Sequence, residues 1–170
     1  MSWLKKLLQG FNAINIIVGK TVSYLVLVMV GLVFSIVVMR YVFSTGRIWL
    51  QELVIWMHAT VFLLSAAYAL SEDSHVRVDV FFRRWGRESQ NRINLIGSVL
   101  CLCPVSLFLV FGSLDYVASS WVLQEASKDA GGLVYPFIPL LKTMIPLCGA
   151  MLFFQALFIS HRAIQETRND

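Results

Sequence analysis

Hydrophobic residues dominate four stretches of the chain, and none of these stretches contains Asp, Glu, Lys or Arg; they cover residues 21–39, 53–71, 93–114 and 143–160. A helix rises about 1.5 Å per residue, so about 20 residues cross the roughly 30 Å hydrocarbon core of a bilayer once. The pattern therefore predicts an all-α integral membrane protein with four transmembrane helices. The connections are too short to fold as separate domains, so residues 1–170 are expected to form a single membrane domain.

The segment before the first span, residues 1–17, repeats apolar side chains at helical spacing: Trp3, Leu4, Leu7, Leu8, Phe11 and Ile14. The polar residues Lys5, Lys6, Gln9 and Asn12 mostly face elsewhere on such a helix. This pattern predicts an N-terminal amphipathic helix that lies in the membrane interface. An extended first helix is the alternative, and the pattern leaves it open.

The distribution of charged residues predicts how the chain is oriented in the membrane. Only 14% of the residues are charged, against about 25% in soluble domains, and the net charge is +4. The N-terminal segment, the second connection and the C-terminal tail share one side of the membrane and hold ten of the fourteen Lys and Arg residues. Cytoplasmic loops collect these residues, so both termini are predicted to be cytoplasmic. Topology therefore explains the basic charge better than nucleic-acid binding does.

His58 is the only His, Asp, Glu, Lys or Arg inside a span, about 9 Å inward from Glu52. An ionisable residue there indicates function by default, but this one has no intramembrane partner for a proton relay. The Cys residues lie in apolar runs and suit packing rather than disulfides. No haem-type His pair, metal cluster, phosphate loop or nucleophile arrangement occurs, so no cofactor, metal or catalytic site is expected and an enzyme ranks last. A stand-alone, homo-oligomeric transporter or channel that uses His58 is the alternative function.

The connections carry the remaining candidate residues. Arg40, Arg47, Trp49 and Glu52 flank the first, outer connection, where charges either anchor the helix ends or bind another protein. The cytoplasmic connection opens with His75-Val-Arg77-Val-Asp79, which we expect to be helical or an ordered turn. Gly131-Gly132 breaks the third connection. Residues 133–141 then either dip into the outer interface or start the last helix before Lys142.

Three motifs together resemble the small membrane subunit, the DctQ-like or Q component, of tripartite ATP-independent periplasmic (TRAP) transporters. The first is Arg40-Tyr-Val-Phe followed by Trp49-Leu-Gln-Glu52-Leu, and the second is His75-Val-Arg77-Val-Asp79-Val. The third is the last-helix pattern of Pro139, Pro146, Gly149 and Gln155. The family often has two acids before the Leu, whereas this chain has Gln51-Glu52.

The resemblance implies a non-enzymatic subunit in the bacterial inner (cytoplasmic) membrane. In such systems a periplasmic substrate-binding protein, the P component, delivers an organic acid such as sialic acid or a C4-dicarboxylate. A large elevator-type membrane subunit, the M component, couples its uptake to sodium. The resemblance implies that the small subunit is a scaffold for the M component. Arg40, Arg47, Trp49 and Glu52 are then the candidates for outer-face contacts, and His75, Arg77 and Asp79 for fixing the cytoplasmic connection.

Overall fold

The computed structural model describes residues 2–72 and 86–169, and the regular structure in these ranges is helical. The elements are α1 (Ser2–Tyr41), α2 (Ile48–Ser71), α4 (Arg87–Gly97), the π-helical turn η1 (Ser98–Leu102), α5 (Cys103–Val122) and α6 (Phe137–Asn169). Four helical stretches are long and apolar enough to cross a membrane: Lys6–Tyr41, Ile48–Ser71, Leu95–Val122 and Phe137–Gln165. The predicted all-α architecture with four spans is confirmed.

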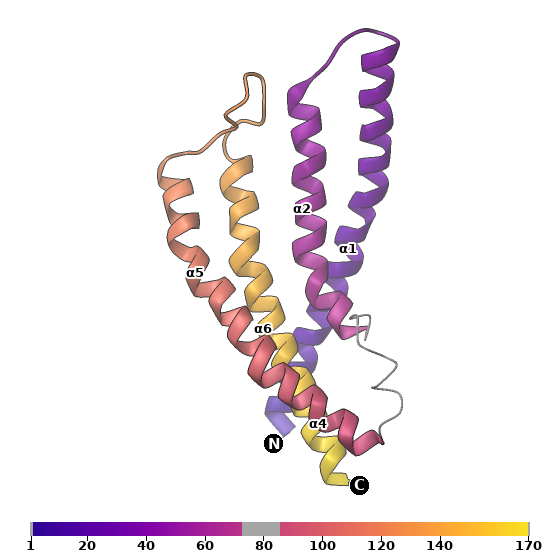
Figure 1. The fold of residues 1–170 in the computed structure, drawn as a ribbon, viewed down its shortest axis with the longest axis vertical. Helices are drawn as coiled ribbons and strands as arrows, with labels where there is room; N and C mark the ends of the chain where they lie inside the picture. Colours follow the sequence, from indigo (N-terminus) through magenta and orange to yellow (C-terminus); the bar gives the residue numbers. More distant parts are fainter. Residues whose placement is uncertain (1, 73–85, 170) are drawn as a thin grey trace.

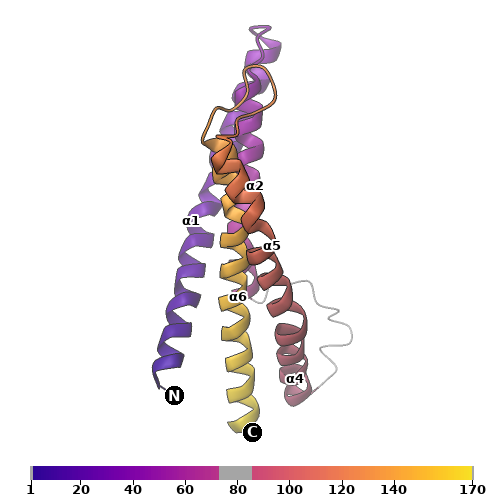
Figure 2. The same ribbon diagram turned by 90° about the vertical axis from the view of Figure 1, so that its left-hand side faces the viewer.

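The helices form two antiparallel pairs that diverge toward one end (Figure 1). In the described part of the chain, α1 packs along α2, α5 packs along α6, and α2 and α6 join the two pairs. Figure 2 gives the perpendicular view, in which α2, α5 and α6 overlap in a narrow upper half. Both termini lie at the opposite end, called here the inner end. The end where α1 finishes and α2 begins is called the outer end.

The N-terminal segment differs from the separate interfacial helix expected over residues 1–17. It continues into the first span without a break, so α1 has 40 residues and is about 60 Å long. Phe11 stacks on Phe154 of α6 with ring centroids 4.0 Å apart. The segment therefore packs against α6 through one face, as the alternative of an extended first helix requires.

The third and fourth spans also differ in their bounds from the sequence prediction. The third continues through α5 to Val122, beyond the expected end at residue 114. Pro104 at the start of α5 has no N–H to donate, and the preceding turn widens so that the Cys103 N–H donates to the Ser98 carbonyl. The fourth helix begins at Phe137, so Lys142 lies inside it and the early start is correct.

Two glycines allow close packing within the helix pairs. A Cβ atom on Gly19 of α1 would lie 2.2 Å from the Tyr68 Cβ of α2. A Cβ atom on Gly149 of α6 would lie 2.9 Å from the Ser106 carbonyl oxygen of α5. Both distances are shorter than a van der Waals contact, so each pair approaches as closely as it does because the side chain is absent.

Candidate partner-binding site

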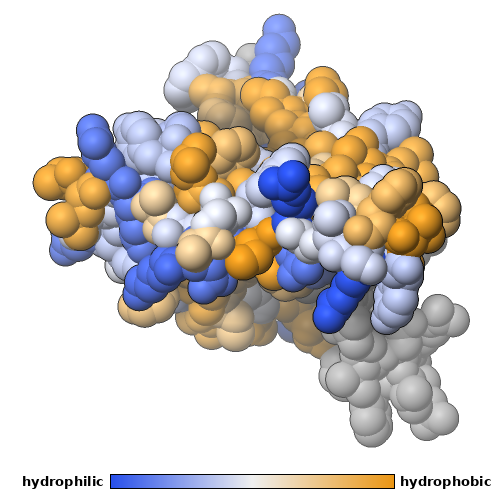
Figure 3. All heavy atoms as spheres, turned by 90° about the horizontal axis from the view of Figure 1, so that it is seen from above, coloured by the Kyte–Doolittle hydropathy of each residue, from blue (hydrophilic) through white to orange (hydrophobic). Residues whose placement is uncertain are grey.

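The loop of residues 123–136 joins α5 to α6 at the outer end and extends toward α2 (Figure 1). Seen from above in Figure 3, hydrophilic and hydrophobic residues lie side by side across this end of the molecule. Two carboxylates hold this loop, one from α2 and one from the loop itself. They give the outer end a defined shape.

Glu52, in the first turns of α2, binds the loop directly. Its carboxylate accepts a hydrogen bond from the Ser127 hydroxyl at 2.5 Å and one from the Leu133 backbone N–H at 2.6 Å. Gly132 lies against it, because a Cβ atom there would be 2.7 Å from either Glu52 oxygen. The Ser127 backbone N–H also donates to the Leu133 carbonyl at 2.9 Å, which closes the loop. Glu52 therefore joins the first and third connections.

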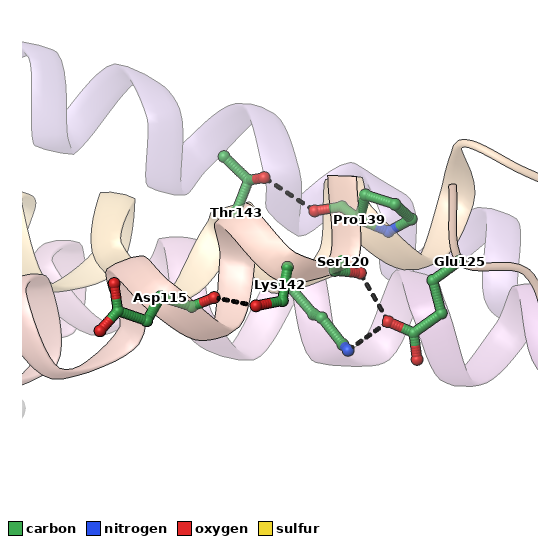
Figure 4. A network of polar contacts seen from close by, with 7 residues as sticks. Asp115, Ser120, Glu125, Pro139, Lys142 and Thr143 are labelled. Carbon is green, nitrogen blue, oxygen red and sulfur yellow. Dashed lines mark hydrogen bonds and ion pairs between the residues drawn. The ribbon is translucent and has the colours of Figure 1, made fainter. Parts of the chain in front are cut away.

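Glu125 holds the other side of the loop (Figure 4). Its carboxylate forms an ion pair with Lys142 of α6 and accepts a hydrogen bond from the Ser120 hydroxyl of α5 at 2.6 Å. These two hydrogen bonds lower the pKa of the Glu125 carboxyl, and the lysine's charge adds to the effect. The Lys142 ammonium also lies 3.9 Å from the centroid of the Tyr116 ring. The cluster joins α5, the loop and α6.

Two tryptophans form further hydrogen bonds at the outer end. The Trp56 indole of α2 donates to the Phe137 carbonyl at 2.7 Å, at the first residue of α6. The Trp121 indole of α5 donates to the Thr143 hydroxyl at 3.0 Å and packs edge-on against Tyr135. Tryptophan suits such positions because its ring is apolar and its N–H needs an acceptor. These contacts fix the start of α6 relative to both neighbouring helices.

The predicted outer-face residues divide into two groups. Arg40 in the last turn of α1 and Arg47 just before α2 are exposed, and Trp49 is 43% exposed. Glu52 differs from them because its carboxylate is already bound to the loop. The structure therefore leaves the two arginines and Trp49 accessible at the outer end, and it gives Glu52 contacts within the chain.

The last-helix motif lies inside the bundle. Pro139 and Gln155 are almost fully buried, Gly149 contacts α5, and Pro146 lies within α6. The Gln155 amide donates to the Asn12 side-chain oxygen at 3.0 Å and accepts from the Asn15 amide at 2.9 Å. Asn15 also donates to the Met151 carbonyl at 3.3 Å. This amide cluster attaches the N-terminal half of α1 to α6.

Other candidates lie elsewhere. His75, Arg77 and Asp79 of the cytoplasmic motif fall outside the described residues. His58 is exposed on α2 and does not point into the bundle. Among the described residues no group of three or more His, Cys, Asp and Glu side chains could hold a metal ion.

Sequence reasoning missed the contacts that Ser127, Glu125, Asn12 and Asn15 make. A signal was present for the amide cluster, because two Asn residues interrupt an apolar helical pattern and Gln155 lies in an otherwise apolar span. Amides in a membrane bundle bond to one another across helices. The loop contacts had no comparable signal, because Ser127 lies 75 residues from Glu52 in the sequence.

Comparison with known proteins decides the family. Residues 29–167 match the family described as the DctQ component of tripartite ATP-independent periplasmic transporters. The chain belongs to this DctQ family. It is also similar to the C4-dicarboxylate TRAP transporter small permease protein DctQ of Vibrio cholerae serotype O1, with 26% identity over 115 residues. That match covers 68% of this chain but only 48% of the relative, so the chain spans about half of the relative's length.

Family membership has direct consequences. DctQ-family proteins are components of transporters and not enzymes, and the family's tripartite name implies partners within a TRAP system. The four apolar helices agree with a multi-pass membrane protein. The match includes all three sequence motifs, from Arg40 to Gln155.

Proposed function

We propose that this DctQ-family chain is the scaffold subunit for the large elevator-type M component in a bacterial inner membrane. The complex takes up an organic acid, coupled to sodium, after a periplasmic P component delivers it. The family match over residues 29–167 is the observation that carries the proposal. The name of the Vibrio cholerae relative favours the C4-dicarboxylate class over sialic acid as the substrate.

The outer end supports a scaffold in particular. Two carboxylate clusters hold the loop of residues 123–136 against α2, α5 and α6, and two tryptophans fix the start of α6 beside α2 and α5. A braced surface loses little conformational entropy when a partner binds it. Glu52 is then a positioning residue for the loop. Arg40, Arg47 and Trp49 supply the contacts with the M or P component, and His75, Arg77 and Asp79 fix the cytoplasmic connection.

The defining experiment is substrate uptake in proteoliposomes under a sodium gradient. The M component alone is expected to give little uptake, and adding this chain is expected to restore it when the P component and its substrate are present. Full uptake by the M component alone would refute the scaffold role. Uptake by this chain alone would instead support the stand-alone transporter.

The outer-face contacts can be tested separately by replacing both arginines, as Arg40→Gln and Arg47→Gln. If they bind an acidic surface of the P component, uptake at a limiting P concentration falls and becomes less sensitive to salt. Lys6→Gln is the matched control, because Lys6 is an exposed basic residue at the inner end. Equal effects of the inner and outer replacements would exclude a specific outer contact.

A further inference from the structure

One stripe of exposed side chains follows the outer half of α2, at spacings of four, three and four residues: Gln51, Ile55, His58 and Phe62. This spacing puts them on a single face of the helix. The buried residues of α2 lie on the opposite face and pack into the bundle: Met57, Thr60, Leu64, Ala67 and Leu70. Ile55 and Phe62 are 65% and 71% exposed, so the stripe is uncovered by the described part of this chain.

His58 makes this stripe unlike an ordinary lipid-facing surface. It lies about 9 Å inward from Glu52, so its short side chain is at hydrocarbon depth and cannot reach the headgroups. Within residues 2–72 and 86–169, no hydrogen bond to its ring is found. A polar ring in hydrocarbon is costly without a hydrogen-bond partner, and ionisable residues in spans almost always face protein or water.

Two exposed serines of α1 show how a polar side chain on a span can form its hydrogen bond within its own helix. The Ser35 hydroxyl donates to the Gly31 carbonyl at 2.8 Å, and the Ser23 hydroxyl donates to the Lys20 carbonyl at 2.7 Å. Their exposure therefore requires no other molecule. His58 has no such bond to its own helix, so its partner must come from outside the described chain.

We infer that the stripe of Gln51, Ile55, His58 and Phe62 is the binding face for a transmembrane helix of the large membrane subunit. That helix carries a polar side chain at the depth of His58, which hydrogen-bonds the imidazole. Ile55 and Phe62 provide apolar contact on either side. A lipid tail offers no hydrogen-bonding group, which favours a protein helix as the occupant. The inference rests on the proposed function, because it names the face through which the scaffold holds its partner.

Photocrosslinking in membranes that contain the assembled complex tests the face. A benzophenone amino acid replaces Phe62 in one variant and Phe108 in the control. Phe108 lies on α5, away from the stripe, and is 74% exposed. We expect an adduct with the large subunit from position 62 at several times the yield from position 108. Equal yields, or adducts with only lipid or a second copy of this chain, overturn the inference although the complex is intact. Failure to recover any complex refutes the proposed function as well.

Substitution of the imidazole tests its hydrogen bond. His58→Ala is expected to weaken the association of the two subunits about threefold, the average effect of one interhelical hydrogen bond in a membrane. His58→Gln keeps a hydrogen-bonding side chain and is expected to retain part of the affinity. Ser35→Ala is the matched control, because its hydroxyl bonds its own helix. The stability of each isolated variant is measured by unfolding, so that a weaker association caused by misfolding is recognised. An unchanged affinity for His58→Ala overturns the hydrogen bond.

Discussion

Substitution of Gly149 by alanine tests whether α5 and α6 are held together by a backbone contact. A Cβ atom there would lie 2.9 Å from the Ser106 carbonyl oxygen, 3.0 Å from the Leu109 Cβ and 3.0 Å from the Val110 Cγ2. The oxygen belongs to a helix backbone and cannot rotate away, so the helices must separate by a few tenths of an ångström. Such overpacking costs about 1–3 kcal/mol, while alanine gains up to about 1 kcal/mol in helix propensity. Gly149→Ala should therefore lower the free energy of unfolding by up to about 2 kcal/mol, and it should be about 1–3 kcal/mol less stable than a glycine-to-alanine variant that has only the propensity gain.

Gly31→Ala is the matched control, because no atom of another helix lies within 4 Å of a Cβ at Gly31 of α1. Only the propensity gain acts there, so the isolated chain should be unchanged or slightly more stable. Both variants are compared by loss of helical circular dichroism during titration of detergent micelles with a denaturing detergent. If Gly149→Ala is as stable as Gly31→Ala, the close approach of α5 and α6 does not depend on the missing side chain.

Two further contacts give predictions of a similar kind. Gln155→Leu removes two hydrogen bonds to α1 and should cost about 1–3 kcal/mol of stability in the same titration. Asn12→Leu should cost less stability when it is added to the Gln155→Leu variant than when it is made in the unaltered chain. Additive losses would contradict a shared cluster. The Glu125 contacts should stabilise the chain fully above the usual glutamate pKa of about 4.3, and this stabilisation should disappear as the pH falls through the lowered pKa of the folded state. Glu125→Gln should therefore reduce the loss of thermal stability at acid pH. An unchanged loss would mean that other groups cause it.

The spans could be predicted from the sequence because their cause is local. Every residue in a lipid-crossing helix satisfies its backbone within the helix, so an apolar run of sufficient length is enough evidence. Their ends were harder to predict. At the early start of α6, the Trp56 indole donates to the Phe137 carbonyl, a contact between residues 81 apart in the sequence. No window of neighbouring residues contains that information.

The N-terminal segment illustrates the same limit. Its apolar spacing fits both a helix in the interface and an extension of the first span. The choice depends on Gln155, which supplies hydrogen bonds to Asn12 and Asn15 from 140 or more residues away. An interfacial helix would expose the Asn12 and Asn15 amides to water. The sequence pattern alone therefore does not distinguish a water-facing polar face from one that binds Gln155. The motifs also did not separate Glu52, which binds within the chain, from Arg40 and Arg47, which remain exposed.

That separation changes which charges of the outer end a partner can reach. In a sum of charges over the outer connections, the negative charges of Glu52 and Glu125 offset those of nearby basic residues. In the structure both carboxylates are bound within the chain, one to Ser127 and Leu133 and the other to Ser120 and Lys142. Arg40 and Arg47 remain exposed beside the first connection. A partner that approaches the α1–α2 corner therefore meets two exposed basic side chains, while the ionised Glu52 carboxylate is bound to the loop of residues 123–136, which favours an acidic complementary face. Because exposed charges are screened within about 10 Å at 0.1 M salt, such attraction would guide the approach of the partner more than it would hold the complex together.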